Sequence, residues 1–446
     1  MKKESVPSRI KEKDIEASHK NYGTFADNLK TPIHRWFKYP AGYSYKLVKN
    51  KIEEYSLSEK SWVLDPFSGC GTTLIEAKSA GVNATGIELH PFVNWVAKTK
   101  LYWSFDMNLL HSKADELLND ILETVGKNNV ASTITNEFPD LVKKCYSQDT
   151  LAKLKLIRDL IKLKFADEQH YLDFFNLALT DALRVVSTAG TGWPYIAPTK
   201  YAEKKERDPL IEYPKLVERM ISDLNAVLSC WNNNGSSCLL IEGDTREKQA
   251  EINYDSYDLA ITSPPYLNNF DYADRTRLEM YFFGHANTWR DITTQIRDKL
   301  LMAATTQVLR SKFEAKKPLS DSIYTVAPEI YNSLNIKIKE LSKKRLTKGG
   351  KKSYDFMVAG YFNDMYKVIQ QVYSYLKHDS DFILVLGDSA PYGIHIPTEE
   401  YLAEIALGVG FRDYSIQHLR IRGEKWANNP QRHKVLLKES ILCITK

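Results

Sequence analysis

Apolar residues along this chain of 446 residues repeat first with the spacing of a strand and then with the spacing of a helix. Trp62-Val63-Leu64 is a short apolar run that stops at Asp65-Pro66, as a buried strand does before a turn. From Leu74 to Ala80 the apolar side chains share one helical face. Gly69 and Gly71 lie between the two runs and permit a tight turn that brings the backbone close to a ligand. This order of strand, glycine turn and helix predicts a nucleotide-binding loop at the end of a parallel strand.

The residues on either side of this loop extend the pattern. Thr72 and Thr73 are good caps for the helix that follows the turn. Residues 83 to 91 predict a second strand that ends in Glu88, where an acidic side chain can accept hydrogen bonds from both hydroxyls of a ribose. Ahead of the loop, an aromatic segment turns at Tyr39-Pro40-Ala41-Gly42 and leads into a predicted helix.

A third strand does not follow the second within a few tens of residues. Residues 105 to 235 instead carry apolar side chains at helical spacing, which predicts an inserted helical subdomain. The sheet resumes with a strand that ends in Asp244. Including this one, the remaining predicted strands begin at Cys238, Asp258, Asp381, Phe411 and Ser440. The last two predict a closing hairpin.

Composition and cysteine usage indicate the class of protein and its cellular compartment. With 43% hydrophobic and 26% charged residues, the chain has the composition of an ordinary soluble protein. The N-terminus is charged and lacks an apolar core, so we expect no signal peptide, and no apolar run approaches a membrane span. The five scattered cysteines contain no Cys-x-x-Cys pair. They argue for a reducing cytoplasm and against both a disulfide framework and a zinc site, so we expect no metal.

The segment Ile261-Thr-Ser-Pro-Pro-Tyr266 carries the second signature of the chain. Two consecutive prolines fix an extended, donor-free backbone, so the carbonyls around Pro264 meet no competing N–H from either proline. Ser263 offers a hydroxyl and Tyr266 an aromatic face. Hydrogen bonds to Ser263 and a backbone carbonyl would aim the weakly nucleophilic amine of a nucleobase at a methyl donor. Tyr266 would stack on the base once it has left the duplex.

Two stretches resemble the signatures of S-adenosylmethionine-dependent DNA amino-methyltransferases. They are Asp65-Pro66-Phe67-x-Gly69-x-Gly71-Thr72-Thr73 and Thr262-Ser263-Pro264-Pro265-Tyr266. The resemblance implies an α/β fold, a Rossmann-like class I methyltransferase sheet of seven strands, with S-adenosyl-L-methionine as cofactor. It also implies that the Tyr39-Pro40-Ala41 segment encloses the methionine end of the cofactor and that Asp244 binds the adenine amine. The resulting cofactor-binding set is Tyr39, Pro40, Asp65, Pro66, Phe67, Gly69, Gly71, Thr72, Thr73, Glu88 and Asp244, and the catalytic set is Ser263, Pro264, Pro265 and Tyr266.

The identity of residue 263, a serine, indicates which base is methylated. Thr-Ser-Pro-Pro-Tyr is similar to the pattern of cytosine-N4 enzymes, whereas relatives that methylate adenine N6 more often carry Asp or Asn there. A cytosine-C5 mechanism would need a Pro-Cys nucleophile, and that dipeptide does not occur. We therefore favour a cytosine-N4 DNA methyltransferase, as the modification half of a restriction–modification pair. An adenine-N6 enzyme, an RNA base methyltransferase and a cofactor-binding module without turnover are the alternatives.

Charge is distributed unevenly along the chain, whose formal net charge is +5. Residues 286 to 355 carry a net +8, while residues 105 to 235 carry a net −3. We expect the positive segment, which follows Tyr266, to contact double-stranded DNA. The residues selected for this contact are Lys343, Lys344, Arg345, Lys348, Lys351 and Lys352.

The predicted organisation combines these parts. Residues 1 to 30 form an N-terminal arm, and residues 31 to 104 together with 236 to 446 form the catalytic domain. Residues 105 to 235 form the helical insertion, and residues 286 to 355 form a basic insertion. The expected partners are double-stranded DNA and a cognate restriction endonuclease, with no membrane. The expected location is the cytoplasm of a prokaryote, in association with the nucleoid.

Overall fold

The computed structural model describes residues 21–39, 42–127, 135–189, 196, 204–231, 235–313, 317–422 and 435–446. A seven-stranded sheet forms its centre, in the order β3-β2-β1-β4-β5-β7-β6. Neighbouring strands are parallel except that β7 runs antiparallel to both β5 and β6. The strands are β1 (Trp62–Asp65), β2 (Asn83–Ile87), β3 (Cys238–Ile241), β4 (Tyr257–Thr262), β5 (Leu376–Gly387), β6 (Asp413–Arg422) and β7 (Leu437–Thr445). This confirms the predicted Rossmann-like methyltransferase sheet and its closing hairpin.

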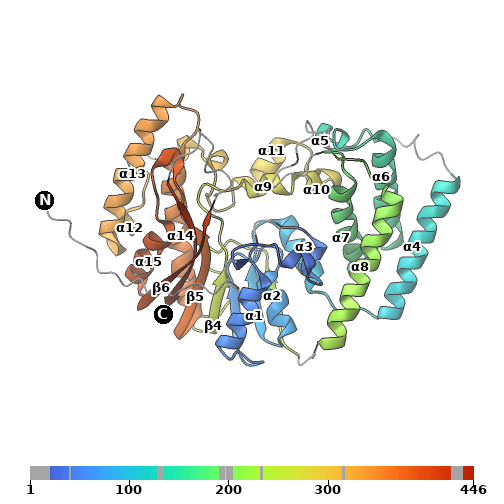
Figure 1. Cartoon of the computed structure of the whole chain (residues 1–446), viewed down its shortest axis with the longest axis horizontal. Helices are drawn as coiled ribbons and strands as arrows, with labels where there is room; N and C mark the ends of the chain where they lie inside the picture. Colours follow the sequence, from blue (N-terminus) through green and yellow to red (C-terminus); the bar gives the residue numbers. More distant parts are fainter. Residues whose placement is uncertain are drawn as a thin grey trace.

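Side chains that alternate along the strands enter two separate cores, as the two-residue period of a strand requires. Val63 packs with α1 (Tyr45–Glu54) and α2 (Thr72–Ser79) on one face of the sheet. Leu64 points to the other face. That face is covered by α13 (Pro328–Thr347), α14 (Tyr354–Tyr375) and α15 (Thr398–Val409), with α12 (Asp321–Val326) beside them (Figure 1).

Helices occupy the chain between β2 and β3. They are α3 (Pro91–Leu101), α4 (Met107–Lys127), α5 (Asp140–Lys143), α6 (Gln148–Lys164), α7 (Gln169–Val186) and α8 (Pro209–Cys230). The last begins at Pro209, because the Asp208 side chain caps Leu210 N and Pro209 opens the first turn. Figure 1 shows α4 to α8 gathered on one side of the molecule, away from β5 to β7.

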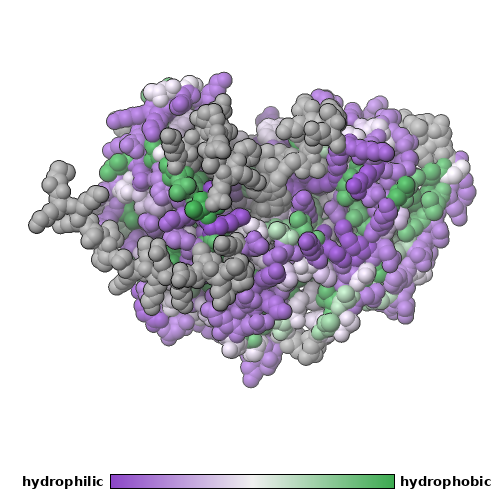
Figure 2. All heavy atoms as spheres, viewed as in Figure 1, coloured by the Kyte–Doolittle hydropathy of each residue, from purple (hydrophilic) through white to green (hydrophobic). Residues whose placement is uncertain are grey.

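The helical insertion shares its core with the scaffold. Trp36 and Phe37, from the aromatic segment before the loop, are buried in the same cluster as the helices of the insertion. Trp36 donates from its ring nitrogen to Asp223 on α8, and Arg35 pairs with the same carboxylate. Apolar side chains also remain on the outer side of these helices. Leu122 is 59% exposed and Leu163 is 79% exposed. Figure 2 shows green patches on the mainly hydrophilic surface of the side where Figure 1 places α4 and α6.

The chain after β4 divides between the two cores. Its first part contains α9 (Tyr272–Arg275), α10 (Arg277–Phe282), α11 (Trp289–Ile292) and the π-helix Thr293–Arg297, and it packs with the helical insertion. Its second part begins at Leu301 and packs against the sheet through α12 and α13. The segment predicted as one basic insertion is therefore two packed units that meet at Leu300 and Leu301.

Short 3-10 turns complete the described structure at Asn28–Lys30, His34–Trp36, Thr305–Gln307, Arg310–Lys312 and Pro391–Gly393. Among the described helices, none combines the length and the apolar composition needed to cross a membrane.

Candidate active site

The glycine turn after β1 forms as its sequence predicts, although the helix cap differs. Gly69 and Gly71 have φ angles of 51° and 86°, in the left-handed region that favours glycine. Gly71 itself is the N-cap of α2, so Thr72 and Thr73 lie in the first turn of the helix rather than capping it. The Thr73 hydroxyl is instead fully buried and donates to Asp65. The prediction of Thr72 and Thr73 as caps was wrong, because the backbone of Gly71 already supplies the reversal.

Asp65 is a buried junction between the two signatures. Its carboxylate accepts hydrogen bonds from the Thr262 hydroxyl at 2.7 Å, the Tyr43 hydroxyl at 3.3 Å and Phe67 N at 3.1 Å, besides the bond from Thr73. Burial raises the pKa of Asp65 to about 6, and these hydrogen bonds oppose the rise. Asp65 does not line the cavity described next. It therefore fixes the loop from behind.

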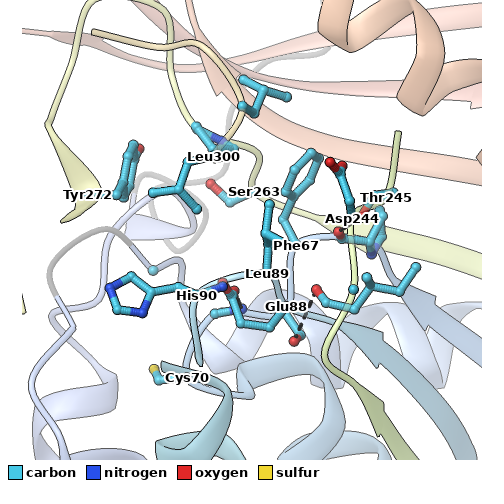
Figure 3. A pocket seen from close by; sticks show the side chains of 18 of the residues that line it. Phe67, Cys70, Glu88, Leu89, His90, Asp244, Thr245, Ser263, Tyr272 and Leu300 are labelled. Atoms are coloured by element: carbon cyan, nitrogen blue, oxygen red, sulfur yellow. Dashed lines mark hydrogen bonds between the residues drawn. The ribbon is translucent and has the colours of Figure 1, made fainter. Parts of the chain in front are cut away.

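A cavity lies at the carboxyl ends of β1, β2, β3 and β4 (Figure 3). Nine of the predicted residues line it: Tyr39, Pro66, Phe67, Gly69, Thr72, Glu88, Asp244, Ser263 and Pro265. Five do not line it: Asp65, Gly71, Thr73, Pro264 and Tyr266. Pro40 lies outside the described residues. The structure thus brings most of the predicted cofactor-binding set and half of the predicted catalytic set together around one cavity.

Glu88 joins the glycine turn to the end of β2. Its two carboxylate oxygens accept from Gly69 N at 2.9 Å and from His90 N at 2.8 Å. Burial raises the pKa of Glu88 to about 7, against the effect of these backbone hydrogen bonds. The carboxylate lines the cavity while also holding the loop that forms its floor.

At the β3 end of the cavity, Asp244 belongs to an ion-pair chain. Arg246 donates to it through Nε at 2.9 Å and through Nη2 at 2.6 Å, and its Nη1 lies 3.0 Å from Asp364 on α14. Asp364 also accepts from Met302 N at 3.0 Å. These ion pairs and hydrogen bonds connect Asp244 to the segment that contains Leu300 and Leu301, two further residues of the cavity wall.

Sequence reasoning missed several residues of the wall, among them His90 and Tyr272. His90 is 2% exposed, and its Nε2 lies 2.7 Å from the Thr276 hydroxyl. Burial lowers the pKa of His90 to about 4, so the ring is neutral near pH 7. Figure 3 shows Ser263 between Tyr272 and Phe67, with Glu88 and His90 below them in that view. Nothing in the local sequence marks Tyr272, which follows the Ser-Pro-Pro-Tyr signature by six residues.

The Tyr266 ring is not presented to the cavity. The residue is 8% exposed, and the Arg422 guanidinium lies 5.1 Å from the ring centroid. The Tyr266 hydroxyl donates to Glu439 at 3.3 Å, and its backbone N–H donates to the Tyr272 hydroxyl. Stacking of a base on Tyr266 stays a prediction, whereas Tyr272 already forms an aromatic wall.

The six basic residues selected for DNA lie at the end of α13 and in the turn after it. Five are exposed lysines, but Arg345 is half-buried and donates to Gly350 O. Gly349 and Gly350 both have positive φ, and Gly350 N donates to Arg345 O, which defines a fixed turn. None of the six lines the cavity. The described residues also contain no group of three His, Cys, Asp or Glu side chains placed to hold a metal.

Comparisons with known proteins agree with this geometry. A family of N6 and N4 methyltransferases, described as DNA methylase, matches residues 2–99. The Type II methyltransferase M.BsoBI of Geobacillus stearothermophilus is 24% identical, over 96% of this chain and 88% of its own length. M.AvaI of Anabaena variabilis is 26% identical, over 87% of this chain and 81% of its own length. M.MvaI of Kocuria varians is 22% identical, over 91% of this chain and 87% of its own length.

The sheet, the cavity and these similarities support an amino-methyltransferase, a family that uses S-adenosylmethionine as methyl donor. The similar proteins that span most of the chain are Type II methyltransferases, which supports a role in DNA methylation and restriction–modification.

Proposed function

We propose that the protein transfers a methyl group from S-adenosylmethionine to the exocyclic N4 amine of cytosine at a specific sequence in double-stranded DNA. It would be the modification enzyme of a restriction–modification system, with a cognate endonuclease as partner. One observation carries this proposal. The glycine turn after β1 and Ser263 after β4 line the same cavity, because their strands are paired neighbours in the sheet.

The cavity residues fit the predicted cofactor. Glu88 presents a carboxylate beside the glycine turn, where it would accept from ribose hydroxyls, and Asp244 at the β3 end would accept from the adenine amine. Tyr39, Phe67, Gly69 and Thr72 would surround the remainder. When bound, the cofactor supplies a methyl group already activated on a sulfonium. Asp65 would not contact the cofactor but would hold the glycine turn in place, because it accepts hydrogen bonds from Phe67 N and the Thr73 hydroxyl.

Ser263 would position the target amine. An exocyclic amine is a poor nucleophile because its lone pair is delocalised into the ring. Hydrogen bonds to the Ser263 hydroxyl and the Pro264 carbonyl would favour a pyramidal nitrogen aimed at the methyl group. The base must leave the duplex to reach this point, and Tyr272 offers it an aromatic wall beside Ser263. The serine in place of an acidic or amide side chain supports cytosine N4 over adenine N6.

Five exposed lysines at the end of α13 would hold the DNA backbone. Lys343, Lys344, Lys348, Lys351 and Lys352 lie on one short stretch and form no ion pair with another residue of the described chain. Contacts from such side chains to phosphates supply affinity rather than sequence specificity.

One experiment tests the proposal. The full-length protein is incubated with duplex DNA or with RNA and with methyl-labelled cofactor, and the products are digested to nucleosides. We expect label in N4-methylcytosine from DNA. Label in N6-methyladenine would show that the target base is adenine rather than cytosine. Label in RNA would show that the substrate is RNA rather than DNA. No label in either nucleic acid would overturn the proposal.

A further inference from the structure

Two arginines and a glutamate connect the helical insertion to the segment that precedes the glycine turn. Arg184, in the last turn of α7, donates to both carboxylate oxygens of Glu279 on α10, at 3.0 Å to Oε2. It also donates to the carbonyl of Arg275 on α9 at 2.7 Å. Arg275 donates in turn to Glu279 Oε1 at 3.5 Å and to the Lys38 carbonyl. Figure 1 shows α10 next to α9, with α7 close to α10.

The carboxylate at the centre of this network is fully buried. Glu279 is 0% exposed and Arg275 is 4% exposed. Burial acts to raise the pKa of Glu279, but Arg184 and Arg275 outweigh it and hold that pKa below its ordinary value. Burial lowers the pKa of Arg275 to about 10, so its guanidinium is still charged near pH 7. A buried charge needs its partner, so each member of the network fixes the position of the others.

The segment that Arg275 holds leads directly to a wall of the cavity. Lys38 precedes Tyr39, which is 8% exposed and lines the cavity. A Cβ atom on Gly69 would lie 3.5 Å from Tyr39 Cε1, so the Tyr39 ring packs on the glycine turn. The Phe37 ring stacks with the Tyr39 ring at 6.2 Å between centroids, and the Arg275 guanidinium lies 5.4 Å from the Phe37 centroid. Arg275 therefore supports Tyr39 through both the backbone and the ring beside it.

The helical insertion also holds the beginning of this segment. Asp223 on α8 is 2% exposed and accepts from Arg35 Nε at 2.9 Å and from the Trp36 ring nitrogen at 3.0 Å. Among its described residues, the segment forms only the 3-10 turn His34–Trp36 ahead of α1. Little backbone hydrogen bonding fixes it, so its position depends on the side chains that contact it. Residues 35 to 38 are thus attached to the insertion at both ends, through α8 and through Arg275.

Resting on the proposed function, we propose that Arg275 and Glu279 are positioning residues for S-adenosylmethionine, through which the helical insertion holds Tyr39 against the glycine turn. Neither Arg275 nor Glu279 lines the cavity, so both act through Tyr39. Asp244 and Glu88 are assigned to the adenine and the ribose, which leaves the Tyr39 wall for the methionine end of the cofactor. The network therefore controls how tightly the methionine end is bound.

Arg275→Met tests this role in the full-length protein, by calorimetry with two relatives of the cofactor. S-adenosylhomocysteine carries the amino-acid part of the cofactor, and 5′-methylthioadenosine lacks it. We expect the Kd of the variant to rise at least ~10-fold for S-adenosylhomocysteine and to change less than about twofold for 5′-methylthioadenosine. With duplex DNA, the KM for S-adenosylmethionine should rise with that Kd, while kcat at saturating cofactor stays within about threefold of the wild-type value.

A conservative variant separates positioning from a general loss of stability. Arg275→Lys keeps a positive charge beside Glu279, but one ammonium group cannot reach Glu279 and the Lys38 carbonyl together as the planar guanidinium does. We expect its Kd for S-adenosylhomocysteine to rise about threefold, between the wild type and Arg275→Met, with 5′-methylthioadenosine again unaffected. Circular dichroism and melting measurements check the fold of each variant. If Arg275→Met does not fold, the same comparison of two ligands on Arg275→Lys decides alone.

Arg310→Met is a matched control. Arg310 lies 3.1 Å from the carboxylate of Asp355 on α14, which is 0% exposed like Glu279, and neither Arg310 nor Asp355 lines the cavity. Arg310→Met should bind both ligands with wild-type affinity. Wild-type affinity of Arg275→Met for S-adenosylhomocysteine would overturn the positioning role, and so would equal losses for the two ligands. A wild type that binds S-adenosylhomocysteine but methylates no nucleic acid would instead overturn the proposed function, while the comparison of the two ligands would still decide the positioning role.

Discussion

The Thr262 hydroxyl donates a 2.7 Å hydrogen bond to the Asp65 carboxylate, and this bond joins the ends of β4 and β1 inside the protein. Asp65 begins one signature, and Thr262 immediately precedes Ser263 in the other. The relative position of the cofactor loop and the methyl-transfer site is therefore set by a direct contact between buried side chains.

Replacing Asp65 tests this junction. Asp65→Ala removes the acceptor of four hydrogen bonds, and losing one charge-assisted bond in a buried site costs about 1.5–3 kcal/mol. We expect cofactor affinity measured by calorimetry to fall at least ~10-fold and the melting temperature to fall with it. Asp167→Ala, at an exposed position on the helical insertion, is the control and should change neither. Unchanged affinity in Asp65→Ala would show that the loop does not need the junction.

Replacing Ser263 separates binding from chemistry. Ser263→Ala should leave cofactor affinity within about twofold, because the hydroxyl faces the cavity beyond the glycine turn. The single-turnover rate of methyl transfer should fall by about 10²-fold or more, since the amine loses its positioning partner. Calorimetry and rapid-quench kinetics on one preparation measure both quantities. Full activity in Ser263→Ala would refute the role assigned to the hydroxyl.

His90 gives the protein a predictable dependence on pH. Its pKa is about 4 in the folded state, against an ordinary value of about 6.5, so the unfolded chain binds more protons between these values. The stability that His90 contributes is present above pH 6.5 and is lost as pH falls toward 4. Between pH 7.5 and 5.5 the loss amounts to about 1 kcal/mol.

The measurement compares denaturant unfolding of the wild type and of His90→Gln at those two pH values. The loss on acidification should be smaller in His90→Gln by about that 1 kcal/mol. His111→Gln, at an exposed position on α4, should keep the full wild-type loss. An unchanged pH dependence in His90→Gln would mean that folding does not lower the pKa of His90.

The lysines after α13 predict where the duplex is held. Changing Lys343, Lys344, Lys348, Lys351 and Lys352 to Gln should weaken DNA binding and reduce the slope of log affinity against log salt by about 0.9 for each phosphate that is no longer neutralised. Cofactor affinity should not change, since none of the five lines the cavity. Arg345 is retained in this variant because its bond to Gly350 O supports the turn.

A matched set lies on the helical insertion. Lys127, Lys143, Lys144, Lys162 and Lys215 are also exposed, and their change to Gln should affect DNA binding much less. If the second set reduces the salt slope and the first does not, the DNA face lies on the insertion.

The fold and most of the cavity could be predicted because their signals are local. Gly69 and Gly71 indicate a turn in their own neighbourhood, and the apolar period distinguishes strands from helices. The pairs Arg246–Asp364 and Tyr266–Glu439 could not be predicted, since their members lie 118 and 173 residues apart and meet only after the sheet has formed. The role of Thr73 was predicted wrongly because a cap and a buried donor look alike in sequence.

The polypeptide passes from one hydrophobic core to the other between Leu300 and Leu301, and this has a thermodynamic consequence. Leu300 packs with the core of the helical insertion, Leu301 with the core under the sheet, and both form part of the cavity wall. Any ligand that alters the separation of the two cores must then also alter the cavity. Linkage makes this coupling reciprocal, so a duplex that binds across both cores would change the affinity for cofactor by the same factor by which cofactor changes the affinity for duplex.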